Sequence, residues 1–209
     1  MIKKILKKFI SGNTRGKMRE MEKVVRWYLS GKSVSTPGLI KQRTLKKIGI
    51  KHNIRIFVET GTAGGGTVDA LKKYFTKVYS IEIDDRLFNN AKNKFFNDKN
   101  VEILHGDSGV VLTKLMQQIN EPALFWLDGH YSGENTGRGS LETPIMSELN
   151  AIFEHNIKNH IILIDDARCF DGTNDYPHID ILRQQVAHYI PNHTMYIIND
   201  IIHIFLNNK

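Results

Sequence analysis

The sequence predicts an α/β fold with a doubly wound sheet, in which helices cover both faces of an open set of strands. From residue 53 onward, short apolar segments typical of buried strands alternate with amphipathic segments typical of helices. Helical crossovers between the first five strands make those strands parallel. The last two apolar segments are separated only by Asn199 and Asp200, which is enough for a hairpin but not for a crossover. We therefore expect seven strands, five parallel and two in a C-terminal antiparallel hairpin.

The expected elements follow this alternation along the chain. Strands are predicted at residues 54–59, 77–83, 101–104, 123–127, 161–164, 194–198 and 201–206. Helices are predicted between them at residues 67–74, 85–96, 109–119, 144–156 and 179–189.

The charge divides the chain into two regions. Residues 1–51 contain 15 Lys or Arg against two Glu, whereas the rest of the chain is acidic. We interpret residues 1–51 as a basic helical N-terminal extension and residues 52–209 as the sheet domain. Within the extension we expect a short basic amphipathic helix over residues 1–10, a break at 11–17, and helices at 18–29 and 39–48.

The role of the first helix has two readings that the sequence leaves open. Residues 1–10 place apolar side chains on one helical face and lysines on the other. This helix therefore either attaches to an anionic membrane surface or packs on its own domain or a partner. The lysines also interrupt any apolar stretch long enough for a secretory signal, so we do not expect export.

Composition excludes several classes of protein. Hydrophobic residues make up 41% of the chain and charged residues 24%, which excludes disorder of the whole chain. No apolar run reaches the roughly 18 residues of a membrane-spanning helix. The single cysteine, Cys169, allows no intrachain disulfide and fits a reducing cytoplasm. We expect a cytoplasmic protein, and peripheral contact with the inner membrane surface through residues 1–10 is one of the two open readings of that helix. A homo-oligomer is compatible with the sequence. We expect no nucleic-acid partner, because the main body is acidic.

A glycine-rich loop after the first strand predicts a cofactor site. Glu59 ends the strand, and the loop holds Gly61, Gly64, Gly65 and Gly66 before a helix. Glycines let the backbone approach a ligand closely and adopt positive φ. Two further signals follow: Glu82 lies 21 residues after Gly61, near the distance expected for an acid that binds ribose hydroxyls, and Asp107 and Ser108 end the third strand.

Two cofactor classes compete for this loop. A dinucleotide fingerprint needs glycine where this chain has Ala63, which disfavours a nicotinamide cofactor. Glu59 at the mouth of the loop would repel a pyrophosphate, but it suits a cationic amino-acid group.

The motifs ETGTAGGGT, SIEID, HGDS and WLDGH resemble, in this order, those of class I S-adenosylmethionine (SAM)-dependent methyltransferases, whose fold is Rossmann-like. The resemblance covers residues 54–206. It implies that the methionine part of SAM lies on the glycine loop, the ribose on Glu82 and the adenine beside Asp107. The cofactor-binding residues that it implies are Glu59, Gly61, Thr62, Gly64, Gly65, Glu82, Asp107, Ser108 and Asp128.

A second group of polar residues follows the fourth and fifth strands: Asp128, His130, Asp165 and Asp166. Oxygen-rich clusters of this kind suit a hard divalent ion such as Mg²⁺. Asp128, Asp165 and Asp166 match the metal ligands of the metal-dependent, macrocin-type sugar O-methyltransferases that this arrangement resembles. The alternative is that Asp165 or Asp166 caps the following segment and that Asp128 contacts only the cofactor.

The function expected from these residues is SAM-dependent O-methylation of a hydroxylated small molecule or sugar, assisted by a divalent metal. His130 is the candidate general base, with Asp128 beside it as the second catalytic residue. Arg168 either binds an anionic substrate or forms a surface ion pair. Two other functions stay open: a noncatalytic or membrane-recruited nucleotide-binding module of the same fold and, less favoured, an NAD-dependent oxidoreductase.

Overall fold

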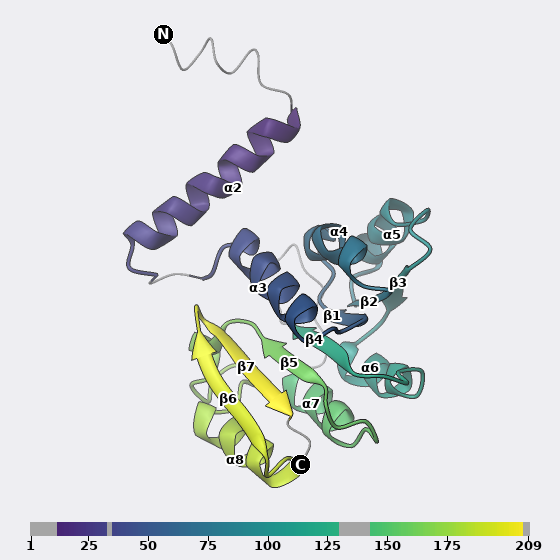
Figure 1. Cartoon of the computed structure of the whole chain (residues 1–209), viewed down its shortest axis with the longest axis vertical. Coiled ribbons are helices and arrows are strands. Elements are labelled where there is room, and N and C mark those ends of the chain that lie inside the picture. The colour runs from purple at the N-terminus through teal and green to yellow at the C-terminus, as the bar shows by residue number, and fades with distance from the viewer. Residues whose placement is uncertain (1–11, 33–34, 130–142, 207–209) are drawn as a thin grey trace.

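The computed structural model describes residues 12–32, 35–129 and 143–206 (Figure 1). One seven-stranded sheet forms its centre, with the strand order β3-β2-β1-β4-β5-β7-β6. The first five strands pair in parallel, and β7 pairs antiparallel with both β5 and β6. The strands are β1 (Ile56–Thr60), β2 (Lys77–Glu82), β3 (Val101–His105), β4 (Ala123–Leu127), β5 (Ile161–Ile164), β6 (His193–Ile198) and β7 (Ile201–Leu206). The predicted fold class is confirmed.

Helices cover both faces of the sheet and close two apolar cores. On one face lie α3 (Gly38–Lys51), α4 (Gly66–Leu71) and α5 (Asp85–Lys94), and on the other α6 (Ser108–Met116), α7 (Ile145–Phe153) and α8 (Ile179–Tyr189). Two short 3₁₀ helices, η1 (Lys72–Tyr74) and η2 (Ala167–Cys169), extend the turns after α4 and β5. Every residue of β1 and β4 is buried, because these central strands have a helix layer on each side.

The two residues of the β6–β7 turn adopt the left-handed backbone conformation that a tight hairpin needs. Asn199 has φ 53° and Asp200 has φ 58°, and two successive positive φ values are typical of a type I′ turn. Ile198 and Ile201 pair directly on either side of these two residues. The two-residue hairpin that the sequence predicts is therefore confirmed.

The N-terminal segment differs from the prediction at one point. A single helix, α2 (Gly12–Leu29), runs through the break expected at residues 11–17 over all of its described residues, so that part of the prediction is wrong. Glycine costs a helix only about 1 kcal/mol, and Gly16 is tolerated inside α2. In Figure 1, α2 lies away from the sheet on the side of α3, and its Val24 and Trp27 are buried. The helix predicted over residues 1–10 lies outside the described residues.

In contrast to α2, α3 packs into the body of the protein. Its Leu45 and Ile48 are buried in the same core cluster as Phe57 of β1 and Phe75. The boundary between the extension and a sheet domain that starts at residue 52 stays a prediction. Within the described ranges, no helix combines the length and apolar character needed to cross a membrane.

Candidate cofactor and acceptor site

The carboxyl ends of β1 to β5 meet at one edge of the sheet, where open α/β folds bind their ligands. The strand order reverses between β1 and β4, and the glycine loop lies at this point. Gly61 has φ +82°, and a Cβ atom placed on it would lie 2.5 Å from the carbonyl oxygen of Asp128. The absence of a side chain at Gly61 therefore lets the loop after β1 contact the backbone after β4.

We expect Gly61→Ala to lower the free energy of unfolding by more than about 1 kcal/mol, because alanine is strained at this φ and meets the Asp128 carbonyl. Gly64→Ala is the matched control, since no atom lies within 4 Å of the position of its Cβ. Urea denaturation of both variants measures the difference. Equal stabilities would contradict the close approach of the two loops.

The carboxyl group of Glu59 is buried beneath the loop. Its Oε2 accepts a 2.7 Å hydrogen bond from the Ser80 hydroxyl, which lies 2.7 Å from the Thr62 hydroxyl. Burial raises the pKa of Glu59 to about 8, against the opposing effect of hydrogen bonds from Ser80 and Thr67. Glu59 is therefore mostly protonated at neutral pH and must lose a proton before it can attract a cation.

Glu82 holds the glycine loop through its backbone. One carboxylate oxygen accepts a 2.8 Å hydrogen bond from the amide of Ala63, and the other accepts one of 2.9 Å from the amide of Asp84. Lys94 also fixes the loop, donating to the carbonyl oxygen of Gly64 at 2.9 Å. Gly65 has φ +65° and is the N-cap of α4. The contact of Glu82 with a ribose stays a prediction.

Asp107 and Ser108 lie at the start of α6. Asp107 is the N-cap of this helix and accepts a 2.9 Å hydrogen bond from the amide of Gly109. The Ser108 hydroxyl donates to the carboxyl group of Glu148 on α7 at 2.6 Å. Burial raises the pKa of Glu148 to about 7, and hydrogen bonds from Ser108 and Thr60 oppose this rise.

The sequence analysis did not single out Glu148. The available signal is an acidic residue among the apolar positions of the helix predicted over residues 144–156. A small cavity opens beside it at the ends of β4 and β5, and Gly129, Glu148, Asp165 and Tyr176 line part of it. The cavity borders the acidic cluster through Asp165 and has room for about one water molecule.

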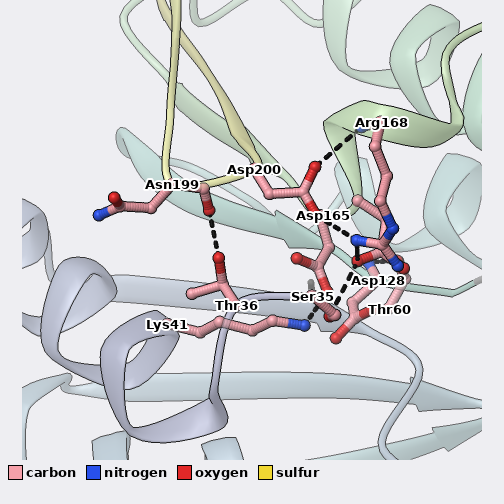
Figure 2. Close-up of polar contacts among 10 residues, drawn as sticks. Ser35, Thr36, Lys41, Thr60, Asp128, Asp165, Arg168, Asn199 and Asp200 are labelled. Atoms are coloured by element: carbon pink, nitrogen blue, oxygen red, sulfur yellow. Dashed lines mark hydrogen bonds and ion pairs between the residues drawn. The ribbon is translucent and has the colours of Figure 1, made fainter. Parts of the chain in front are cut away.

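The structure brings Asp128 and Asp165 together at the ends of β4 and β5 (Figure 2). The charge of Asp166 acts on Asp165, so the three aspartates form one cluster. Burial and the charge of Asp165 raise the pKa of Asp128 well above its usual range. Burial also raises the pKa of Asp165, while the positive charge of Lys41 opposes this rise. Asp166 has φ 53° and is the N-cap residue of η2. His130 lies outside the described residues.

Two cations of the chain itself meet this cluster. Lys41 of α3 forms an ion pair with Oδ2 of Asp165. The guanidinium of Arg168 donates to Oδ1 of Asp166 at 2.8 Å and also pairs with Asp200. Arg168 thus forms ion pairs within the protein, which was one of its two predicted roles. Nothing in the sequence alone marks Lys41, since it is one of several lysines on α3.

The predicted magnesium site requires carboxylates that are free to bind a divalent ion. In the described part of the chain, no three His, Cys, Asp or Glu side chains form a group suited to a metal ion. The arrangement of Asp128, Asp165 and Asp166 therefore does not fit the predicted site, because Lys41 and Arg168 already supply cations to Asp165 and Asp166.

Solved structures share this architecture. TomG, an O-methyltransferase from Streptomyces achromogenes in complex with SAM, superposes with a TM-score of 0.59 at 12% identity, over 83% of this chain and 82% of that one. The O-methyltransferase from Bacillus cereus in complex with S-adenosylhomocysteine (SAH) gives 0.55 at 14% identity, over 90% and 91%. The chain has the class I methyltransferase fold. The 23S rRNA methyltransferase ErmE gives 0.51 at 14% identity, over 80% of this chain and 68% of that one.

The sequence also matches the model of one protein family. A family model described as ribosomal RNA adenine dimethylase matches residues 37–123. This stretch contains α3, the glycine loop and Glu82, and it ends before Asp128. The match thus covers the predicted cofactor-binding half of the site and not the acidic cluster. No curated protein sequence gives a significant match.

Proposed function

We propose that this chain is a SAM-dependent methyltransferase that transfers a methyl group to a hydroxyl oxygen of a small molecule or sugar. The observation that carries the proposal is the conjunction at one sheet edge of Glu59, the glycine loop, Glu82 and Asp107 on this strand order. The O-methyltransferases of the same fold support the choice of oxygen as acceptor.

The geometry supports separate positions for the cofactor and the acceptor along the carboxyl edge of the sheet. The residues at the ends of β1 to β3 would hold the cofactor, whose sulfonium supplies an already activated methyl group. The ends of β4 and β5, beside the small cavity there, would place the acceptor, and their main task is alignment, with the attacking atom about 3 to 3.5 Å from the methyl carbon. Removal of the hydroxyl proton by His130, beside Asp128, stays a prediction from the sequence.

A nucleic-acid acceptor is the second candidate. The matched family model and the 15 basic residues of the N-terminal extension favour it. The match ends before the strand ends that would position an acceptor, so we rank RNA below a small molecule.

Calorimetry tests the cofactor first. We expect SAH to bind the full chain with one site per monomer and NAD to show no binding. A chain that binds NAD in place of SAH would contradict the proposal.

Incubation with isotopically labelled SAM then tests the acceptor against sugars, phenols and ribosomal RNA. Label in a small hydroxylated molecule supports O-methylation, whereas label only in RNA favours the second candidate. A chain that binds SAH and transfers no label is a noncatalytic module.

A further inference from the structure

Lys41 places a positive charge inside the acidic cluster. It enters from α3, and its ammonium group pairs with Asp165, which lies 124 positions further along the chain (Figure 2). The Asp165 side chain is 1% exposed and that of Lys41 is 16% exposed. An ion pair with so little solvent contact is screened only weakly. The attraction of Lys41 to Asp128 and Asp166 adds to that of Asp165.

The segment before α3 fixes Lys41 in this position. The Thr36 hydroxyl donates to the backbone carbonyl of Asn199, and Ser35 lies 3.4 Å from Oδ1 of Asp166. Lys32 donates to the side chain of Asn199 at 3.0 Å. The N-terminal segment is thus tied to the β6–β7 turn and to the end of β5, on the same side as the ammonium group of Lys41.

One carboxylate oxygen of the cluster lacks a hydrogen-bond donor in the part of the chain that the structure describes. Oδ1 of Asp165 is buried and has no hydrogen-bond partner among the described residues. Carboxylate oxygens of this kind bind divalent ions when no other cation occupies the space between them. Here the ammonium of Lys41 stands at Oδ2 of the same carboxylate.

We propose that Lys41 is the resident cation of the Asp128–Asp165–Asp166 cluster, in the place where the sequence predicts a divalent ion. It lowers the mutual repulsion of the carboxylates and keeps the cluster closed to metal. The consequence for catalysis rests on the proposed function: methyl transfer by this chain needs no divalent ion. Lys41 acts on the acceptor side as a positioning residue, since it contacts Asp165 rather than the reacting atoms.

The test is a titration of the full chain with Mn²⁺, followed by the electron paramagnetic resonance signal of the free ion. We expect no binding by the wild type at concentrations up to about 1 mM. Lys41→Ala and Lys41→Gln are expected to bind one ion at least tenfold more tightly than the wild type, because the carboxylates lose their cation. Lys41→Arg keeps the charge and should not bind, and adding Asp165→Asn to Lys41→Ala should abolish binding. Lys47→Ala is the matched control, because Lys47 is an exposed lysine of the same helix.

Two results would overturn the proposal. The first is one Mn²⁺ bound by the wild type and lost in Asp165→Asn. The second is that Lys41→Ala and Lys41→Gln both fold, bind no Mn²⁺ and show no rise in melting temperature with Mg²⁺. If both variants unfold, Mg²⁺ must restore their folding, because a ligand of the native state stabilises it.

Separate experiments test the proposed function and the role of Lys41. A wild type that does not bind SAH contradicts the methyltransferase proposal and leaves the Mn²⁺ results unaffected. With an acceptor in hand, ethylenediaminetetraacetate should leave the wild-type rate unchanged, and a rate that falls with chelator and returns with Mg²⁺ would refute the catalytic part.

Discussion

The dissociation constant of SAH is expected to fall about tenfold per pH unit between pH 6 and 7, and more slowly as pH approaches 8. The reason is that Glu59, with a pKa of about 8, is only about 1% ionised at pH 6 and half ionised at pH 8. Only the ionised form attracts the α-amino cation of the ligand. At still higher pH the affinity should decline again, once the α-amino group of the ligand loses its own proton.

Glu59→Gln should remove this dependence. We expect the variant to bind SAH about as weakly at pH 7 as the wild type does at pH 6, since glutamine cannot carry the negative charge. Calorimetry in two buffers of different ionisation enthalpy measures the proton released on binding, which should approach one for the wild type at pH 7 and be absent in the variant. The control ligand is 5′-methylthioadenosine, which lacks the amino-acid part and should bind equally at every pH. If the affinity of the wild type for SAH did not change with pH, Glu59 would not bind the amino cation and would only accept the hydrogen bond from Ser80.

The second large effect concerns stability. We expect Glu148→Gln to be more stable than the wild type by about 3 kcal/mol at pH 8, and equal to it at pH 4. Folding raises the pKa of Glu148 from its ordinary 4.5 to about 7. The folded state therefore holds a proton that the unfolded state has lost across this window. The stabilisation by that proton is complete below pH 4.5 and lost as pH rises to 7, at about 1.4 kcal/mol per unit.

Urea denaturation at pH 4, 6 and 8 measures this difference. The difference between variant and wild type is the quantity to compare, because Glu59 is also buried with a raised pKa and contributes to both curves. Glu154→Gln is the control, since Glu154 is an exposed glutamate at the end of the same helix. A pH-independent difference would show that Glu148 keeps its charge in the folded protein.

The sheet could be predicted closely from the sequence because its signals are local. Each central strand is a continuous apolar run between turn residues, and β4 and β5 have the boundaries that the sequence predicts. The antiparallel pairing of the last two strands followed from loop length alone. The break expected around Gly12 and Gly16 was wrong, since glycine weakens a helix without forbidding it.

The acidic cluster was predicted in part, for a physical reason. Residues that follow parallel strands must share one sheet edge, so Asp128 and Asp165 were expected to lie together. The ion pair of Lys41 with Asp165 joins residues 124 positions apart, and no periodicity encodes such a contact. The protonated states of Glu59 and Glu148 likewise depend on burial, which the sequence suggests only through apolar neighbours.

The link between Thr36 and Asn199 has a consequence for biosynthesis. These residues are 163 positions apart, and the turn that contains Asn199 precedes only the last strand. Chains emerge from the ribosome N-terminus first, at about 5–20 residues per second. A nascent chain can therefore form its early βα units while the N-terminal segment still lacks its docking point. The acceptor side is completed only after Asn199 has emerged, and chains stalled or truncated before this residue would have a finished cofactor half without it.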